Sequence, residues 1–227
     1  MFSALLSAYT ALLARLSGQK DFVIGMHSAG HSMVDGRDLV GHCINLLPLR
    51  SECNPDLTFL EHASACRKGV FDACEHQFYP YSKLVKDLNL PRDPSRLTLV
   101  EVVFNLDQTV SSPKLFGFAV EVDAIPSGYT KWDLSWNVLD TGKDLAVRCD
   151  YNRDLFSAET IQRWLEEYEL ILNIVARQPQ KNLSSVMEEV ELRSRRKHDQ
   201  RIRTLKAANL ERLKNFKKRP AVAAVTV

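Results

Sequence analysis

Helical periodicity at both ends of a series of short strand-like runs is the feature that most constrains the fold of this chain. Apolar residues recur at helical spacing over residues 2–16 and again over 161–175. Gly18 stops the first helix, while Ser157 caps the second and Pro179 ends it. Between them lie six strand-like stretches, at residues 22–26, 38–50, 99–106, 117–122, 134–139 and 145–151. Helices interleaved with five or six strands predict a layered α/β sandwich.

Three local signals add detail to this prediction. Thr58 and Glu61 have the spacing of a capping box and predict a helix that continues to Cys74. Residues 141–143 read Thr-Gly-Lys and predict a hairpin between the last two strands. Residues 192–216 are helix-prone but carry a thin apolar stripe, so we expect this segment to dock weakly or to wait for a partner.

The net charge of +2 conceals a strong imbalance along the chain. Residues 193–219 hold twelve Lys and Arg but only two acids, Asp199 and Glu211, which leaves 18 basic and 26 acidic residues elsewhere. We therefore divide the chain into a body, residues 1–190, and a basic helical linker or tail, residues 191–227. Such a tail is more typical of a solvated linker or docking arm than of a nucleic-acid reader, and the body offers no basic stripe. We expect no nucleic-acid partner.

Several classes of protein are disfavoured by what the sequence lacks. No apolar run is long enough to span a bilayer, and no signal-peptide pattern is present, so we expect a cytoplasmic protein without a membrane partner. Five cysteines without a C-x-x-C pair are interpreted as free thiols. No phosphate-binding loop, dinucleotide fingerprint, zinc-protease motif or nucleophile elbow occurs. We expect no metal site and no cofactor bound by this chain.

Motif-like segments occur in a fixed order along the body. Residues 12–19 read LLARLSGQ and lead into FVIG at 22–25; GHCINLLPLR, HQFYP and RDPSR follow at 41–50, 76–80 and 92–96. FNL at 104–106, WDL at 132–134 and YNRDLF at 151–156 complete the series. Together, over roughly residues 5–190, these segments resemble the second half of a nonribosomal peptide synthetase condensation domain, and their joint order makes the resemblance specific.

The resemblance implies a pair of chloramphenicol-acetyltransferase-like lobes arranged in a V, of which this chain is one, the C-terminal half, with a helical basic tail. It also implies that carrier proteins deliver phosphopantetheine-tethered acyl groups to a tunnel between the lobes, where an amine attacks a thioester and an amide forms. The family's catalytic histidine belongs to an H-H-x-x-x-D-G motif in the N-terminal lobe. The expected partners are therefore that lobe, peptidyl or acyl carrier proteins and neighbouring synthetase domains, and we expect the chain to be inactive alone.

One segment imitates the catalytic motif. Residues 30–36 read GHSMVDG, so His31 and Asp35 match H-x-x-x-D-G. Three fixed positions arise by chance at about the per-cent level in a chain of this size. Gly30 replaces the first histidine, and the segment falls where the family has a variable loop. We therefore interpret His31 as a surface-loop histidine and assign no catalytic residue to this chain.

The remaining motif residues are candidates for the tunnel wall or for structural contacts. Asn45 lies within an apolar strand and needs a hydrogen-bond partner if it is buried. His76 begins a helix-like segment, where a capping or core-edge role is expected. Trp132 and Trp136, at even spacing, are expected on one strand face as core residues. The full candidate set is Asn45, Arg50, His76, Arg92, Asp93 and Arg96, with the last three as structural pairs that join the lobes.

Two other functions stay open. A condensation-like domain without the histidine motif can serve as a non-catalytic platform that recruits carrier proteins or a tailoring enzyme, with the basic tail as its arm. An acetyltransferase-like trimer with a shared site is weaker, because no His-rich motif lies near the C-terminus. Half of a two-lobed domain also predicts an exposed face, and therefore possible self-association.

Overall fold

A mixed five-stranded sheet organises the molecule. The computed structural model describes residues 1–29, 41–91, 93–108, 116–118, 120 and 128–217, with side chains up to residue 211. The strand order is β2-β1-β3-β4-β5. β1, β3 and β4 run parallel, and β2 and β5 pair antiparallel at the two edges. The strand bounds are β1 (Asp21–Ser28), β2 (Asn45–Glu52), β3 (Val102–Gln108), β4 (Leu134–Asp140) and β5 (Leu145–Tyr151).

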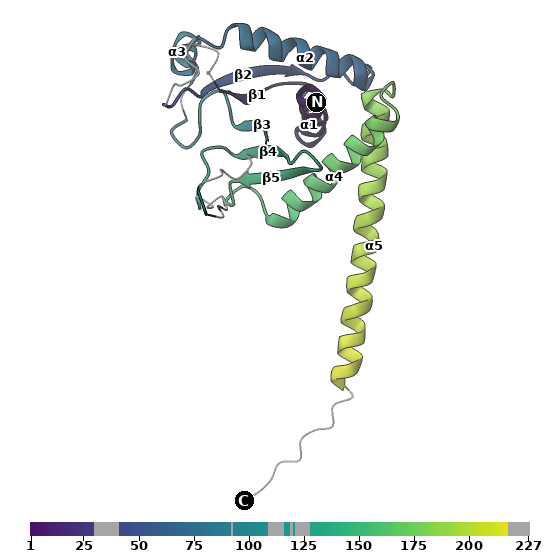
Figure 1. Cartoon of the computed structure of the whole chain (residues 1–227). Helices are drawn as coiled ribbons and strands as arrows, with labels where there is room; N and C mark the ends of the chain where they lie inside the picture. The colour runs from purple at the N-terminus through teal and green to yellow at the C-terminus, as the bar shows by residue number, and fades with distance from the viewer. Residues whose placement is uncertain (30–40, 92, 109–115, 119, 121–127, 218–227) are drawn as a thin grey trace, which may run out of the picture.

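α1, α2 and α4 cover one face of this sheet, whereas α3 lies beside the β2 edge (Figure 1). α1 lies between α2 and α4, and α5 extends far beyond the body (Figure 1). α1 ends at Gly18 with φ 71°, as the sequence predicts, and the predicted capping box of Thr58 and Glu61 begins α2. The Ser157 hydroxyl accepts from the Thr160 N–H at the start of α4. The helix bounds are α1 (Phe2–Ser17), α2 (Phe59–Glu75), α3 (Tyr81–Asp87), α4 (Ala158–Arg177) and α5 (Leu183–Lys217).

Aromatic rings join the helices to the sheet. Tyr9 of α1 packs against Phe104 of β3, with ring centroids 5.3 Å apart, and against Trp136 of β4 at 5.2 Å. Trp136 also meets the edge of Tyr168 of α4 at 5.4 Å. All four side chains are at most 2% exposed. Because alternate strand residues point to opposite faces, every second residue of β3 and β4 faces this helix layer.

A buried carboxylate fixes three helices to one another. Glu167 of α4 is 5% exposed. Its carboxylate pairs with the Arg15 guanidinium of α1 and accepts from the Ser194 hydroxyl of α5 at 2.7 Å. A buried charge persists only when it is paired and hydrogen-bonded, so this contact determines where α5 leaves the body.

Gly25 is required by close packing on the face opposite the helices. A Cβ atom at this position would lie 2.6 Å from Val100 Cγ1 and 3.1 Å from Val103 Cγ2. Both valines are fully buried. Gly25 therefore lets residues 100–103 pack directly on β1.

We expect Gly25→Ala to lower the free energy of unfolding by about 1–3 kcal/mol, because the added methyl overpacks this contact. Gly69→Ala is the matched control. A Cβ at Gly69, within α2, meets nothing within 4 Å, so alanine should raise stability by up to about 1 kcal/mol through helix propensity. Urea unfolding measures both variants. Equal stabilities would contradict the assigned role of Gly25.

A buried polar cluster lies between α1 and α2. The single Thr10 hydroxyl proton goes to the Ser7 carbonyl, at 2.9 Å, so the Thr10 oxygen accepts from His62 Nε2–H at 2.7 Å. Cys66 Sγ lies 3.7 Å from the same nitrogen. Burial lowers the pKa of His62, which is 1% exposed, and raises the pKa of the Cys66 thiol. The histidine is therefore held neutral and the thiol protonated.

This cluster predicts acid sensitivity. An unfolded histidine binds a proton near pH 6.5, but folded His62 binds it only at lower pH, so the unfolded state carries more protons between those two values. The free energy of unfolding should therefore fall as pH drops from about 7 to 5, and the slope should be shallower in His62→Gln. Urea unfolding across this pH range gives both slopes. Identical slopes would show that His62 carries none of the effect.

α5 begins as part of the core and continues into solvent. Leu183, Val186 and Val190 are buried, whereas residues 195–211 are exposed. The helix passes residue 190 without interruption and Ser194 is still half-buried, so the division at 190/191 stays a prediction. None of the helices in the described part of the chain is both long enough and apolar enough to cross a membrane.

The structure differs from the sequence-based expectations at two points. Trp136 is a core residue, but Trp132 precedes β4, so strand alternation does not extend to it and the two rings do not share a face. A helix was expected to begin at His76, but α3 begins only at Tyr81. The strand expected over residues 117–122 lies mostly outside the described residues.

Candidate functional site

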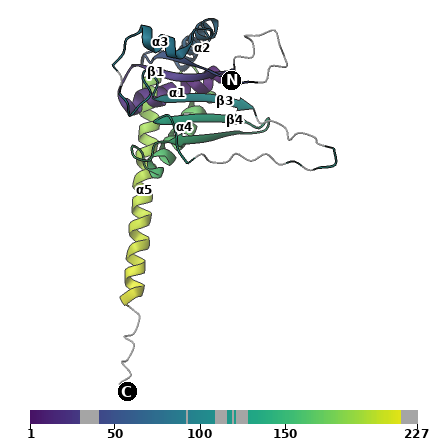
Figure 2. The ribbon, with the colours of Figure 1, turned by 90° about the vertical axis from the view of Figure 1, so that its left-hand side faces the viewer.

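The face of the sheet opposite the helices carries the polar side chains. Figure 2 views the molecule from the side on which the strands lie. In β3 and β4, Phe104 and Trp136 face the helices, so their neighbours Asn105 and Asn137 face the other way. His27, next to the core residue Met26, has the same orientation in β1. We refer to this surface as the open face.

Three of these residues form a polar row across neighbouring strands: His27, Asn105 and Asn137. Asn105 pairs with Asn137 in the β3–β4 register. Met26 pairs with Phe104, so His27 and Asn105 follow at the same level one position further along. All three are half-buried. His27 lies near the carboxyl end of β1, whereas Asn105 and Asn137 are the central residues of β3 and β4.

Asp107 organises the two carboxamides of the polar row. Its carboxylate accepts from Asn105 Nδ2 at 2.9 Å and from Asn137 Nδ2 at 2.8 Å. Because a carboxylate only accepts, both NH₂ groups must face it, and each carboxamide oxygen is directed elsewhere. Asn137 Oδ1 is buried without a hydrogen-bond partner among the described residues.

His27 packs against an aromatic ring and is influenced by the charge of Asp107. Its ring packs edge-on against Trp132, with centroids 6.0 Å apart. Burial lowers the pKa of His27, and the negative charge of Asp107 partly opposes that shift. The imidazole is therefore neutral at pH 7. Sequence motifs missed His27, although the period of two in strand side-chain direction places it on the face opposite Ile24 and Met26.

The predicted candidate Asn45 joins two separated motifs. Asn45 begins β2, and its Nδ2 donates to the carbonyls of Gln77 at 2.8 Å and Tyr79 at 3.3 Å. Ser28, at the end of β1, donates to Gln77 Oε1 at 2.7 Å. The GHCINLLPLR and HQFYP segments therefore meet beside the β1–β2 pair, where both hydrogen bonds of the Asn45 carboxamide nitrogen join them.

His76 occupies the opposite end of a helix from the one predicted. It is the C-cap of α2, where its N–H donates to the Ala73 carbonyl at 3.2 Å, and α3 begins only at Tyr81. Pro80 explains the interruption, because a proline cannot donate a helical hydrogen bond. The expectation that His76 begins a helix was wrong.

Arg96 joins another pair of motifs. Its guanidinium lies 3.3 Å from Glu101 Oε1 and 3.6 Å from Asp133 Oδ2, which follows Trp132. Asp93 accepts from the Ser95 N–H at 2.8 Å and so shapes the turn before Arg96. These contacts fix the entry into β3 and β4 within this body. A role between lobes stays a prediction.

The other candidates lie away from the polar row or outside the described residues. Arg50 of β2 donates to both oxygens of Asp21, at 2.9 and 2.7 Å, and lowers the pKa of that carboxyl. It therefore closes the exposed end of the β1–β2 pair. His31, Asp35 and Arg92 are outside the described residues.

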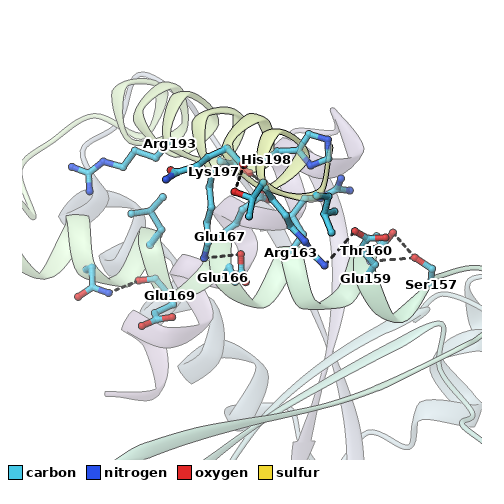
Figure 3. Close-up of a pocket in the computed structure, with 17 residues that line it drawn as sticks. Ser157, Glu159, Thr160, Arg163, Glu166, Glu167, Glu169, Arg193, Lys197 and His198 are labelled. Atoms are coloured by element: carbon cyan, nitrogen blue, oxygen red, sulfur yellow. Dashed lines mark hydrogen bonds and ion pairs between the residues drawn. The ribbon is translucent and has the colours of Figure 1, made fainter. Parts of the chain in front are cut away.

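A groove of about 1070 Å³ between α4 and α5 is lined by opposite charges (Figure 3). Lys197 Nζ lies 2.9 Å from Glu166, and Arg201 lies 3.7 Å from Glu159. These exposed pairs contribute at most about 1 kcal/mol each. The groove lies between α4 and the part of α5 that leaves the body. It is on the helix side of the sheet rather than on the open face. Among the described residues, no group of His, Cys, Asp and Glu has an arrangement that would hold a metal ion.

Comparisons with known proteins agree with the motif resemblance. A family model described as the condensation domain matches residues 1–194. The chain is 35% identical over 185 residues to surfactin synthase subunit 1 of Bacillus subtilis, covering 81% of this chain and 5% of that protein. It is 31% identical over 196 residues to tyrocidine synthase 2 of Brevibacillus parabrevis, covering 82% and 5%. The chain thus spans about 5% of the length of these curated relatives.

Solved structures give the same fold. The condensation domain from Monacolin K polyketide synthase superposes with a TM-score of 0.69 at 27% identity, over 80% of this chain and 42% of that one. The starter condensation domain of rhizomide synthetase gives 0.70 at 20% identity, over 81% and 44%. The X-domain from teicoplanin biosynthesis gives 0.68 at 23%, over 81% and 43%. The last two likenesses establish the fold alone.

Proposed function

This chain belongs to the condensation-domain family, and from that membership we propose that it is the C-terminal lobe of an enzyme that joins carrier-tethered acyl groups through amide bonds. One observation carries the proposal: four-fifths of the chain superposes on only 42–44% of each condensation domain compared. A second lobe of similar size would complete such a domain. Residues 1–190 would be the lobe, and residues 191–227 the linker toward a neighbouring synthetase domain.

The open face is the surface that this lobe would turn toward the partner lobe. The helix side already has its own covering layer, whereas the open face carries hydrogen-bonding groups that a closed core would not retain. Enclosing these groups between two lobes would form a channel that excludes water. Its polar side chains would then act on substrates in a low-dielectric setting, where such contacts are strongest.

The reaction proposed for the assembled enzyme is aminolysis of a thioester. The acceptor amine nitrogen forms a bond to the thioester carbonyl carbon, the C–S bond breaks, and the amine proton ends on the departing thiol. The phosphopantetheine arms belong to the carrier proteins and enter as substrates. This chain would contribute positioning of the two reactants, which can supply several kcal/mol of the barrier reduction. The histidine that handles the proton would come from the partner lobe.

Native mass spectrometry tests the assembly directly. The full chain is mixed with a lobe that carries H-H-x-x-x-D-G and, separately, with a loaded carrier protein. We expect a 1:1 complex with the lobe. Self-association, which an exposed open face favours, should decrease as the lobe is added. A chain that stays monomeric and forms no complex with the lobe would contradict the proposal.

A non-catalytic platform is the alternative. It is favoured by the likeness to the X-domain, whose complex with OxyB from teicoplanin biosynthesis shares the fold with a TM-score of 0.69 at 22% identity. The solvent-exposed basic part of α5 would then be the recruiting arm. In the same experiment, this function predicts binding to a carrier protein or a tailoring enzyme and none to the lobe.

A further inference from the structure

We propose that the polar row binds the primary amine of the acceptor substrate, with His27 as one of its hydrogen-bond acceptors. This inference rests on the proposed function and assigns a ligand group to residues on the open face. It is carried by the hydrogen-bonding capacity of the polar row, by its charge and by its spacing.

The polar row offers acceptors that nothing in the described structure uses. Asp107 accepts hydrogen bonds from the NH₂ groups of Asn105 and Asn137. The two carboxamide oxygens are therefore left as acceptors for a ligand. Asn137 Oδ1 is buried and unpartnered among the described residues. Buried acceptors without a partner are uncommon in folded proteins, and they point to a ligand or water.

The charge near the polar row favours a cationic or neutral donor over an anion. Asp107 forms no ion pair with any described side chain. Arg148 is opposite Asn137 in the β4–β5 register, and its guanidinium is paired with Asp150 at 3.1 Å. A carboxylate with several neutral acceptors repels phosphate or carboxylate ligands and attracts an amine.

The spacing of the three polar-row side chains fits one ligand group that carries several N–H bonds. Neighbouring strands are about 4.8 Å apart, so a group above Asn105 lies within side-chain reach of His27 and Asn137 on the two flanking strands. A protonated primary amine has three donors and no acceptor, whereas an amide has a single N–H if it is secondary. An acceptor amine therefore matches the polar row better than the amides of a pantetheine arm.

His27 is suited to accept a hydrogen bond rather than to carry a positive charge. Its ring nitrogens make no hydrogen bond to any described residue, and the Trp132 ring restricts its orientation. Burial keeps the pKa of the imidazole below its usual range, so a lone pair is available at neutral pH. The ammonium loses one proton to solvent before attack. His27 would then hold the neutral amine, and the second proton passes through the base of the partner lobe to the departing thiol.

Binding to the full chain alone tests the site without requiring catalysis. The probe is an L-alanyl pantetheine analogue with an amide in place of the thioester, titrated by NMR against the chain, and its N-acetylated form is the control ligand. We expect the free amine to bind at least about tenfold more tightly than the acetylated form, a difference of about 1.4 kcal/mol. Equal affinities would overturn the amine assignment.

Variants locate the site. His27→Ala and Asn137→Ala should each weaken amine binding by about tenfold, His27→Asn should restore most of it by keeping an acceptor, and Ser135→Ala, on the same face but outside the polar row, should leave it unchanged. Unfolding midpoints confirm that the variants are folded. Unchanged affinity in both alanine variants would sink the proposal.

A kinetic test separates this inference from the proposed function. In the chain assembled with the partner lobe, His27→Ala should raise KM for the aminoacyl acceptor and leave KM for the donor unchanged. If the assembly forms no amide but the binding differences persist, the proposed function fails and the amine site stands. If amide forms and KM for the acceptor is unaffected by His27→Ala, the amine site is wrong.

Discussion

Replacing Trp136 with alanine is expected to lower the free energy of unfolding by about 3–5 kcal/mol. Trp136 is fully buried and joins the sheet to two helices through its ring contacts with Tyr9 and Tyr168. Its indole nitrogen has no hydrogen-bond partner among the described residues, so the loss would come from apolar burial and from the cavity left behind. A loss of this size is a large share of the stability of an ordinary domain.

Trp132 provides the matched control, because it is the same residue type on the opposite side of the sheet. Trp132 is half-buried, and its ring packs edge-on against His27. We expect Trp132→Ala to cost about 1 kcal/mol, with an unchanged urea m-value in both variants. Comparable losses at the two positions would contradict the assignment of a helix-covered core face and an open face.

Periodicity predicted the elements whose burial is strong and local. The hairpin around Gly142 appears as the β4–β5 pair, and α4 spans Ala158–Arg177 beneath the predicted cap at Ser157. The start of α3 was misplaced at His76 because this short helix has no buried residue, so no apolar stripe marks where it begins. Trp132 was placed on the wrong face because its alternation with Trp136 was extended past the start of β4.

The candidate site was less predictable because its contacts join residues far apart in sequence. The motifs identified Asn45 and Arg96, but not that Asn45 would meet Gln77 or that Arg96 would meet Asp133. His27 belongs to no motif, and its neighbours Asn105 and Asn137 come from strands whose order becomes known only in three dimensions. Topology, rather than spacing, assembles the polar row.

The central claim is that this lobe shapes a shared channel while the proton-handling histidine is supplied by another polypeptide segment. Such a base accelerates reactions by about 10²–10⁴-fold, so its absence should be decisive.

Amide formation between two loaded carrier proteins measures this directly, with the chain alone and with the H-H-x-x-x-D-G lobe added. The account predicts no rate above the uncatalysed reaction for the chain alone and turnover once the lobe is present. Turnover by the chain alone that disappears in His31→Ala would contradict it.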